Sequence, residues 1–284
     1  MFKKIFFAAA LLLASELGAK PVVIASIAPV EYLAKAVGGD KIEVQSLAKG
    51  DVHSYEPKPN DMKAVAKARI FIAAGLEFEE AWIPRFKASA KNLVVVKSDA
   101  KIAKLKEERG EQAEHDEKHE SHADPHVWLN PMLAITMARN ISDALIDMDK
   151  ANKDFYLENF QKLMNDLLAF DESAKNELAG LKNRKFVVYH PAWGYFAAHY
   201  DLEQISIERS GKEPKIDEMA STLKMIKDEN IKVIFADPNR SQKSAQILAS
   251  HTGAKVELLD PLGYNLLENL KIAVGAIKDA NSPK

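Results

Sequence analysis

The apolar residues of this chain form short runs that alternate with stretches of helical periodicity. Short runs bounded by Gly, Pro or polar residues predict buried strands, and apolar residues three or four positions apart predict helices. Regular alternation of the two favours parallel sheets with helices on both faces. The predicted strands are residues 21–28, 42–47, 70–74, 93–97, 185–189, 202–207, 232–236 and 255–259, and the helices between them are residues 30–37, 61–68, 79–90, 193–199, 216–229, 242–251 and 265–278.

Two longer helical patterns separate the two alternating series. One covers residues 131–148, and the other covers residues 152–181. The second would span about 45 Å at ~1.5 Å per residue, which is long enough to cross between two lobes. We therefore predict an α/β fold with two parallel-sheet α/β lobes joined by a single long spine helix. The expected domains are residues 20–150, the linking helix at 151–182, and residues 183–284.

The N-terminus has the pattern of a secretory signal peptide. Two lysines precede an apolar run at residues 5–14, and small residues follow up to Ala19. The run is shorter than the about 20 residues that a spanning helix needs, which argues against a retained membrane anchor. We expect residues 1–19 to be removed and the protein to lie in the periplasm. The chain has no cysteine, so we expect neither disulfides nor a lipid-modified N-terminal Cys.

Composition narrows the class of partner. The chain has 284 residues, of which 47% are hydrophobic, and a formal net charge of −2. A hydrophobic fraction of this size supports a substantial core. The absence of a basic excess argues against nucleic-acid binding. We expect a monomer.

Four of the eight histidines lie between residues 115 and 131. His115, His119 and His122 belong to a charged, apolar-poor loop at about residues 106–122, whereas His126 lies in the compact segment DPHVWLNP. So many imidazoles close together suggest a divalent metal, zinc first. The loop is either a weak accessory zinc collector or a solvated linker that happens to contain histidine.

Candidate ligands also occur beyond the ends of predicted strands, where α/β sheets bind ligands. They are His53, His126, His190 and Asp260, and a proline follows each at short range. Together they predict a tetrahedral site in the cleft between the lobes, with Asp124 and Glu56 as candidate acceptors for ring N–H groups. A histidine there can also be an ordinary hydrogen-bonded loop residue, and Asp260 a turn residue. His199 and His251 fit helix positions instead.

Four segments resemble the zinc- and manganese-binding solute-binding proteins of bacterial metal ABC importers. They are GDVHSYEPKPNDM, DPHVWLNP, VVYHPAWGYFAAHYDL and LLDPLG, and the resemblance covers essentially the whole mature chain. It implies that His53, His126 and His190 are metal ligands and that Asp260 is the carboxylate many members carry. It also implies the two-lobed fold with its spine helix, Zn²⁺ capture, and delivery to an ABC transporter permease in the inner membrane.

The resemblance also bears on which metal is bound. Manganese-binding members carry Glu where this chain has His190, so zinc is expected, with a manganese or iron binder as the alternative. Val52 replaces the Pro that members more often carry before His53. In some zinc-binding members, water or another carboxylate takes the place of Asp260.

A zinc hydrolase is the competing class of protein. No Glu adjoins a ligand His on a predicted helix as a general base, so we expect no enzyme.

Overall fold

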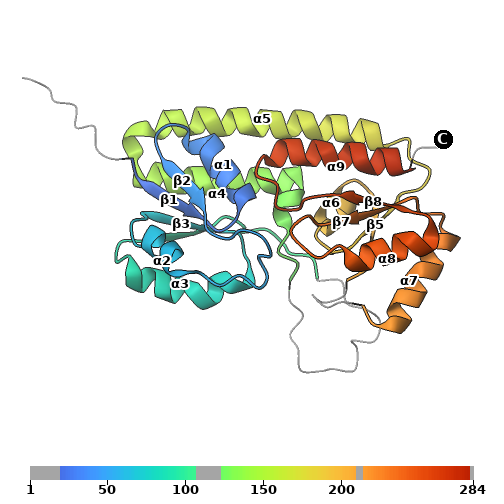
Figure 1. The fold of residues 1–284 in the computed structure, drawn as a ribbon. Coiled ribbons are helices and arrows are strands. Elements are labelled where there is room, and N and C mark those ends of the chain that lie inside the picture. The colour runs from blue at the N-terminus through green and yellow to red at the C-terminus, as the bar shows by residue number, and fades with distance from the viewer. Residues whose placement is uncertain (1–19, 107–122, 209–213, 282–284) are drawn as a thin grey trace, which may run out of the picture.

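The computed structural model describes residues 20–106, 123–208 and 214–281. The predicted signal peptide lies outside these residues, as does the part of the predicted loop that carries His115, His119 and His122. Within them the chain forms two lobes side by side, with one long helix running along both (Figure 1). The predicted fold class is confirmed.

The first lobe is built on a parallel sheet with strand order β2-β1-β3-β4. Its strands are β1 (Val22–Ala25), β2 (Glu43–Ser46), β3 (Ile70–Ala73) and β4 (Val94–Lys97), and its helices are α1 (Ala28–Gly38), α2 (Pro59–Val65) and α3 (Glu77–Ser89). Strand β1 is shorter than predicted because α1 already begins at Ala28. Pro29 lies in the first turn of α1, where proline fits.

The second lobe repeats this order as β6-β5-β7-β8, again all parallel. Its strands are β5 (Lys185–Val188), β6 (Glu203–Ser206), β7 (Val233–Ala236) and β8 (Lys255–Leu258), and its helices are α6 (Gly194–His199), α7 (Ile216–Asp228) and α8 (Lys243–Thr252). Carboxyl ends of parallel strands meet at one edge of a sheet. The loops after β2 and β5 therefore become candidates for a shared site.

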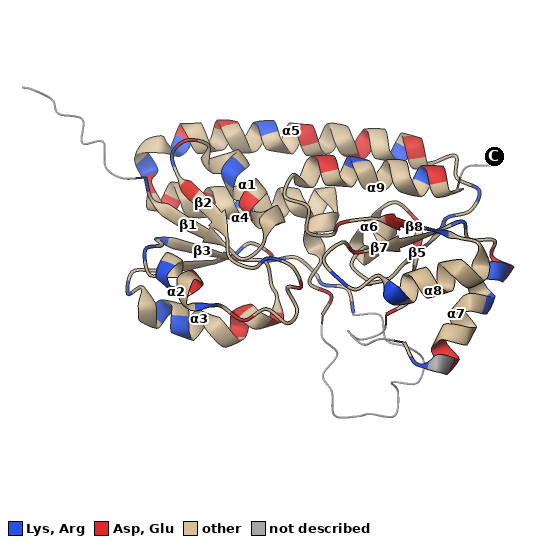
Figure 2. Cartoon of the chain, viewed as in Figure 1, with Lys and Arg blue, Asp and Glu red and all other residues tan. Residues whose placement is uncertain are grey.

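Helices connect the two sheets. They are η2 (Val127–Leu129), α4 (Pro131–Met148), η3 (Lys150–Asn152), α5 (Lys153–Leu178) and α9 (Leu266–Asn281). The predicted spine helix is α5, which lies along the top of both lobes in Figure 1 with α9 beside it. Charged residues of both signs lie on the outward faces of α5 and α9, whereas the strands are mostly uncharged (Figure 2).

Burial divides the hydrophobic residues into two clusters. The larger one runs from the first sheet through α4, α5 and α9 to one face of the second sheet. The smaller one lies on the other face of the second sheet, against α7 and α8. The lobes therefore share a core and are not two separate folding units connected by a bare linker. Among the residues described, no helix combines the length and apolar content needed to cross a bilayer.

Candidate metal centre

His53 lies in the loop that follows β2, and this loop is tied down on both sides of it. The Asp51 carboxylate accepts the backbone N–H of His53 at 3.2 Å and the hydroxyl of Ser54 at 3.0 Å. Tyr55 donates its hydroxyl to the carbonyl of Leu47 at 3.1 Å. These bonds close a local turn that fixes the direction of His53, whose side chain is only partly buried.

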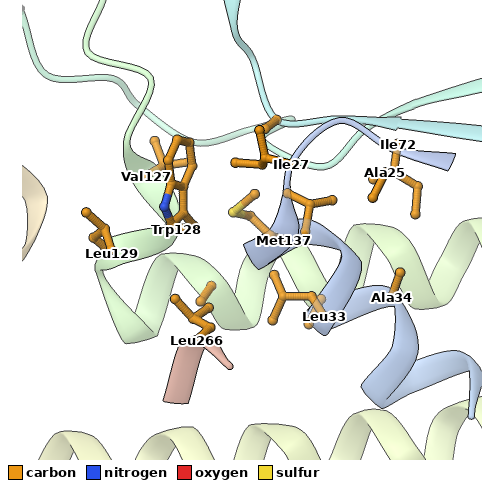
Figure 3. Packing of buried hydrophobic residues seen from close by; sticks show 14 of the residues in the cluster. Ala25, Ile27, Leu33, Ala34, Ile72, Val127, Trp128, Leu129, Met137 and Leu266 are labelled. Carbon is orange, nitrogen blue, oxygen red and sulfur yellow. The ribbon is translucent and has the colours of Figure 1, made fainter. Parts of the chain in front are cut away.

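His126 is held by the short helix η2 that follows it. The side chains of Val127, Trp128 and Leu129 are 0% exposed. Figure 3 shows Trp128 packed among buried side chains that include Ile27, Met137 and Leu266. The Trp128 indole N–H donates to the carbonyl of Pro261 at 2.8 Å, which ties this segment to the second lobe.

His190 lies two residues beyond β5, which is a central strand of the second sheet. Strand pairing continues on both sides of it: Tyr189 donates its N–H to Phe235 at 2.7 Å, and Glu208 donates its N–H to Tyr189 at 2.8 Å. The ring of His190 is buried. Its backbone is thus fixed by the strands themselves.

The three histidines converge from these separate elements. One ring nitrogen of each lies within 4.8 Å of the others, and the ring centroids are 5.1–5.3 Å apart. They line a cavity of about 10 Å³ together with Asp51, Asp237 and Arg240. That volume holds about one water-sized particle, so the size of the cavity fits a single ion.

Hydrogen bonds fix the tautomers of two rings. Nδ1 of His126 lies 2.7 Å from the Asp124 carboxylate, and Nδ1 of His190 lies 3.2 Å from the Glu208 carboxylate. A carboxylate only accepts hydrogen bonds, so both Nδ1 atoms carry the proton and both Nε2 atoms carry a lone pair.

These lone pairs face into the cavity, where the rest of the described chain supplies no donor to them. Nε2 of His126 and Nε2 of His190 are 3.3 Å apart, and Nε2 of His53 is buried with no hydrogen-bond partner among the described residues. Facing lone pairs repel unless a cation lies between them. A tetrahedral ion with bonds of about 2.0–2.1 Å separates its ligand atoms by roughly 3.3 Å. The spacing of the two nitrogens therefore fits such an ion.

Burial also keeps the rings of His53 and His190 neutral. Desolvation, together with the charges of the nearby His126 and Arg240, lowers the pKa of His53 to about 4. Desolvation lowers the pKa of His190 well below its usual value of 6.5, again with contributions from His126 and Arg240. Only neutral imidazole binds a metal, so these two rings are in the form that can bind one at neutral pH.

The sequence prediction missed four charged residues at this site, and one of them, Asp51, lies in the loop after β2. Glu208 follows β6, Asp237 follows β7, and Arg240 lies in the loop before α8. Glu208 and Asp237 each come directly after a predicted strand, which is the signal that selected the histidines. Of the two predicted acceptors, Asp124 bonds His126, whereas Glu56 is exposed.

Asp260 lies outside the group of three histidines as the structure describes it. Its Oδ1 accepts hydrogen bonds from the Asn239 amide and from the backbone N–H of Leu262, both at 2.9 Å. It follows β8, which is two strands away from β5, at about 4.8 Å per strand. A role for Asp260 as fourth ligand stays a prediction.

The other two histidines within the described residues lie elsewhere. Nε2 of His199 lies 2.6 Å from the Asp171 carboxylate on α5. His251 is exposed in the last turn of α8, just before Gly253. Both therefore occupy the helix positions predicted for them.

Comparison with known proteins gives concordant results. A family model described as zinc-uptake complex component A, periplasmic, matches residues 23–280. A putative metal-binding protein of Treponema pallidum is 34% identical over 253 residues, covering 86% of this chain and 80% of that protein. The high-affinity zinc uptake system protein ZnuA of Bacillus subtilis is 30% identical over 284 residues, covering 93% and 88%. A crystal structure of ZnuA superposes with a TM-score of 0.87 at 34% identity, covering 93% of this chain and 100% of that one.

Proposed function

The chain belongs to the family of periplasmic zinc-uptake components, and from this premise we propose that it captures Zn²⁺ with high affinity and delivers it to an ABC-type permease. It acts as a solute-binding protein, so zinc is its cargo and nothing is catalysed. We place it in the periplasm as a monomer, exported by the signal peptide predicted at residues 1–19, with the permease in the inner membrane.

One observation carries this proposal. Three imidazoles each direct a ring nitrogen into a cavity of single-ion size, and no donor among the described residues satisfies Nε2 of His53. Zinc accepts three imidazoles readily, whereas manganese prefers oxygen ligands. We propose His53, His126 and His190 as the ligands, with Asp260 or a water completing the tetrahedron.

Metal titration tests the proposal. Metal-stripped protein is titrated with Zn²⁺ and with Mn²⁺ by calorimetry, and the two metals are then placed in competition. We expect one tight zinc site that Mn²⁺ does not displace. His126→Ala and His190→Ala should each weaken zinc binding strongly, because each removes one of three nitrogen ligands.

The control is His251→Ala, since His251 is exposed at the end of α8. Its zinc affinity should equal that of the unaltered protein. Equal losses in all three variants would contradict the assignment of the site. Tighter binding of Mn²⁺ than of Zn²⁺ would contradict the proposed cargo.

A further inference from the structure

Arg240 lies beside the candidate metal centre and contacts three carboxylates. Its Nη2 lies 3.0 Å from Oδ1 of Asp51, and its Nη1 lies 2.9 Å from both carboxylate oxygens of Glu208. Its Nε lies 3.8 Å from Oδ2 of Asp237. The Arg240 side chain is 14% exposed. Guanidinium offers donors in several directions at once, a geometry that lysine lacks.

The partners of Arg240 come from both lobes, and two of them contact candidate metal ligands. Asp51 belongs to the first lobe, where the same Oδ1 accepts the backbone N–H of His53. Glu208 belongs to the second lobe, where it holds Nδ1 of His190. The Arg240 guanidinium therefore connects Asp51, which bonds the backbone of His53, with Glu208, which bonds the ring of His190.

His53 is the ligand that the rest of the fold fixes least. His126 and His190 are buried and supported by η2 and by the second sheet, whereas His53 is partly buried on a loop. The Asp51 side chain at that loop is 37% exposed, so water can compete for its ion pair with Arg240. Such a pair is stable enough to hold the loop and weak enough to break reversibly.

We propose that Arg240 is a clamp on the metal cavity: its ion pair with Asp51 holds the His53 loop against the second lobe, and breaking that pair is the step that opens the site for zinc release. Arg240 is thus a positioning residue that acts through His53 and sets the rate at which the cargo leaves. This inference rests on the proposed function, because it assumes that zinc occupies the three-histidine site.

Charge alone makes the opposite prediction for Arg240. A positive charge beside the cavity repels Zn²⁺, so removing it without any clamp would make zinc leave more slowly. Loss of the clamp makes zinc leave faster, because the His53 loop opens more often. The sign of the change in dissociation rate therefore separates the two roles.

The test measures zinc dissociation from the purified, zinc-loaded protein by stopped-flow mixing with an excess of chelator. Arg240→Gln and Asp51→Asn should each accelerate dissociation by about fivefold, the upper range for loss of a partly exposed ion pair. The double variant should be no faster than the single variants, because both substitutions break the same pair. Arg240→Lys keeps the charge but cannot bridge both lobes, so it too should release zinc faster.

The matched control is Arg85→Gln, because Arg85 stacks on Trp82 in α3 and contacts none of the site residues. Its zinc dissociation rate should be unchanged. Slower or unchanged release from Arg240→Gln, or additive effects in the double variant, would overturn the clamp. If Arg240→Gln does not fold, unchanged release from Arg240→Lys overturns it. Failure of the unaltered protein to bind zinc would instead overturn the proposed function.

Discussion

At the scale of single residues, the candidate site depends on carboxylates that are not ligands. Asp124 accepts the Nδ1 proton of His126, and Glu208 accepts that of His190, so each ring presents Nε2 to the cavity. Without these acceptors the rings could turn or change tautomer. The orientation that these carboxylates give to each ring therefore contributes to the affinity of the site for metal.

Asp124→Asn should therefore weaken zinc binding by about 10- to 100-fold, because the amide is a poorer acceptor for the His126 ring. Affinity is measured by competition with a chelator of known strength. The matched control is Asp171→Asn, which alters a buried carboxylate that bonds His199 away from the cavity. Equal affinity losses in the two variants would show that the effect is general destabilisation and not ligand orientation.

The lowered pKa of His53 predicts how stability of the metal-free protein depends on pH. Its folded pKa is about 4, against 6.5 in the unfolded chain. Between these values the unfolded state binds a proton that the folded state does not, so the free energy of unfolding falls as pH drops from 6.5 toward 4. Thermal melting of metal-stripped protein at pH 7.5 and pH 5 measures this loss.

His53→Gln should show a smaller loss on acidification than the unaltered protein. The comparison isolates His53 from groups that titrate in the same range. Burial raises the pKa of Glu79 to about 7, for example, which works in the opposite direction because the folded state then binds the proton more readily. An identical pH dependence in both proteins would contradict this prediction.

At the scale of elements, periodicity located strands and helices but placed some ends one to three residues away. Short apolar runs bounded by Gly, Pro or polar residues identified each strand in the two described sheets, and the spacing of apolar residues identified α4 and α5. Residues 27–28 are apolar enough to extend β1, yet α1 begins at Ala28.

Strand order is what the sequence could not supply for the site. The order β6-β5-β7-β8 places His190 after a central strand, with Glu208 and Asp237 after the strands on either side. Asp260 follows β8, one strand further out. The local sequence identifies the residues at strand ends. It does not show which strands are neighbours, because strand pairing depends on contacts between residues that are distant in sequence. The histidines could therefore be predicted, whereas the contacts of Arg240 could not.

The start of α4 offers a test at this scale. The Asn130 side chain accepts the backbone N–H of Met132 at 2.9 Å and that of Leu133 at 3.3 Å, which caps the helix immediately after η2. Asn130→Ala should lower the free energy of unfolding by about 1 kcal/mol. Chemical denaturation measures the loss. Asn130→Asp keeps an acceptor and should retain most of the stability, so an equal loss in both variants would contradict a capping role.

At the scale of the whole molecule, the lobes are joined by more than one helix. The long helix α5 packs against α1 and α4 of the first lobe and against α9, and the larger hydrophobic cluster continues from one sheet to the other. The Trp128–Pro261 hydrogen bond joins the lobes again beside the site. A wide hinge motion would break this shared core, so we expect opening of the site to be local.

Zinc should consequently change the overall dimensions very little. We expect small-angle scattering profiles of metal-free and zinc-loaded protein to coincide, with a radius of gyration of roughly 19 Å for a compact chain of this length. Hydrogen exchange should instead reveal the change in the loop that carries Asp51 and His53, with α5 equally protected in both states. Local opening costs only the contacts of one loop, whereas rotation of a lobe would expose apolar surface along α5 and α9. A marked compaction on zinc binding, together with altered exchange in α5, would show that the lobes move as rigid bodies and that the shared core does not restrain them.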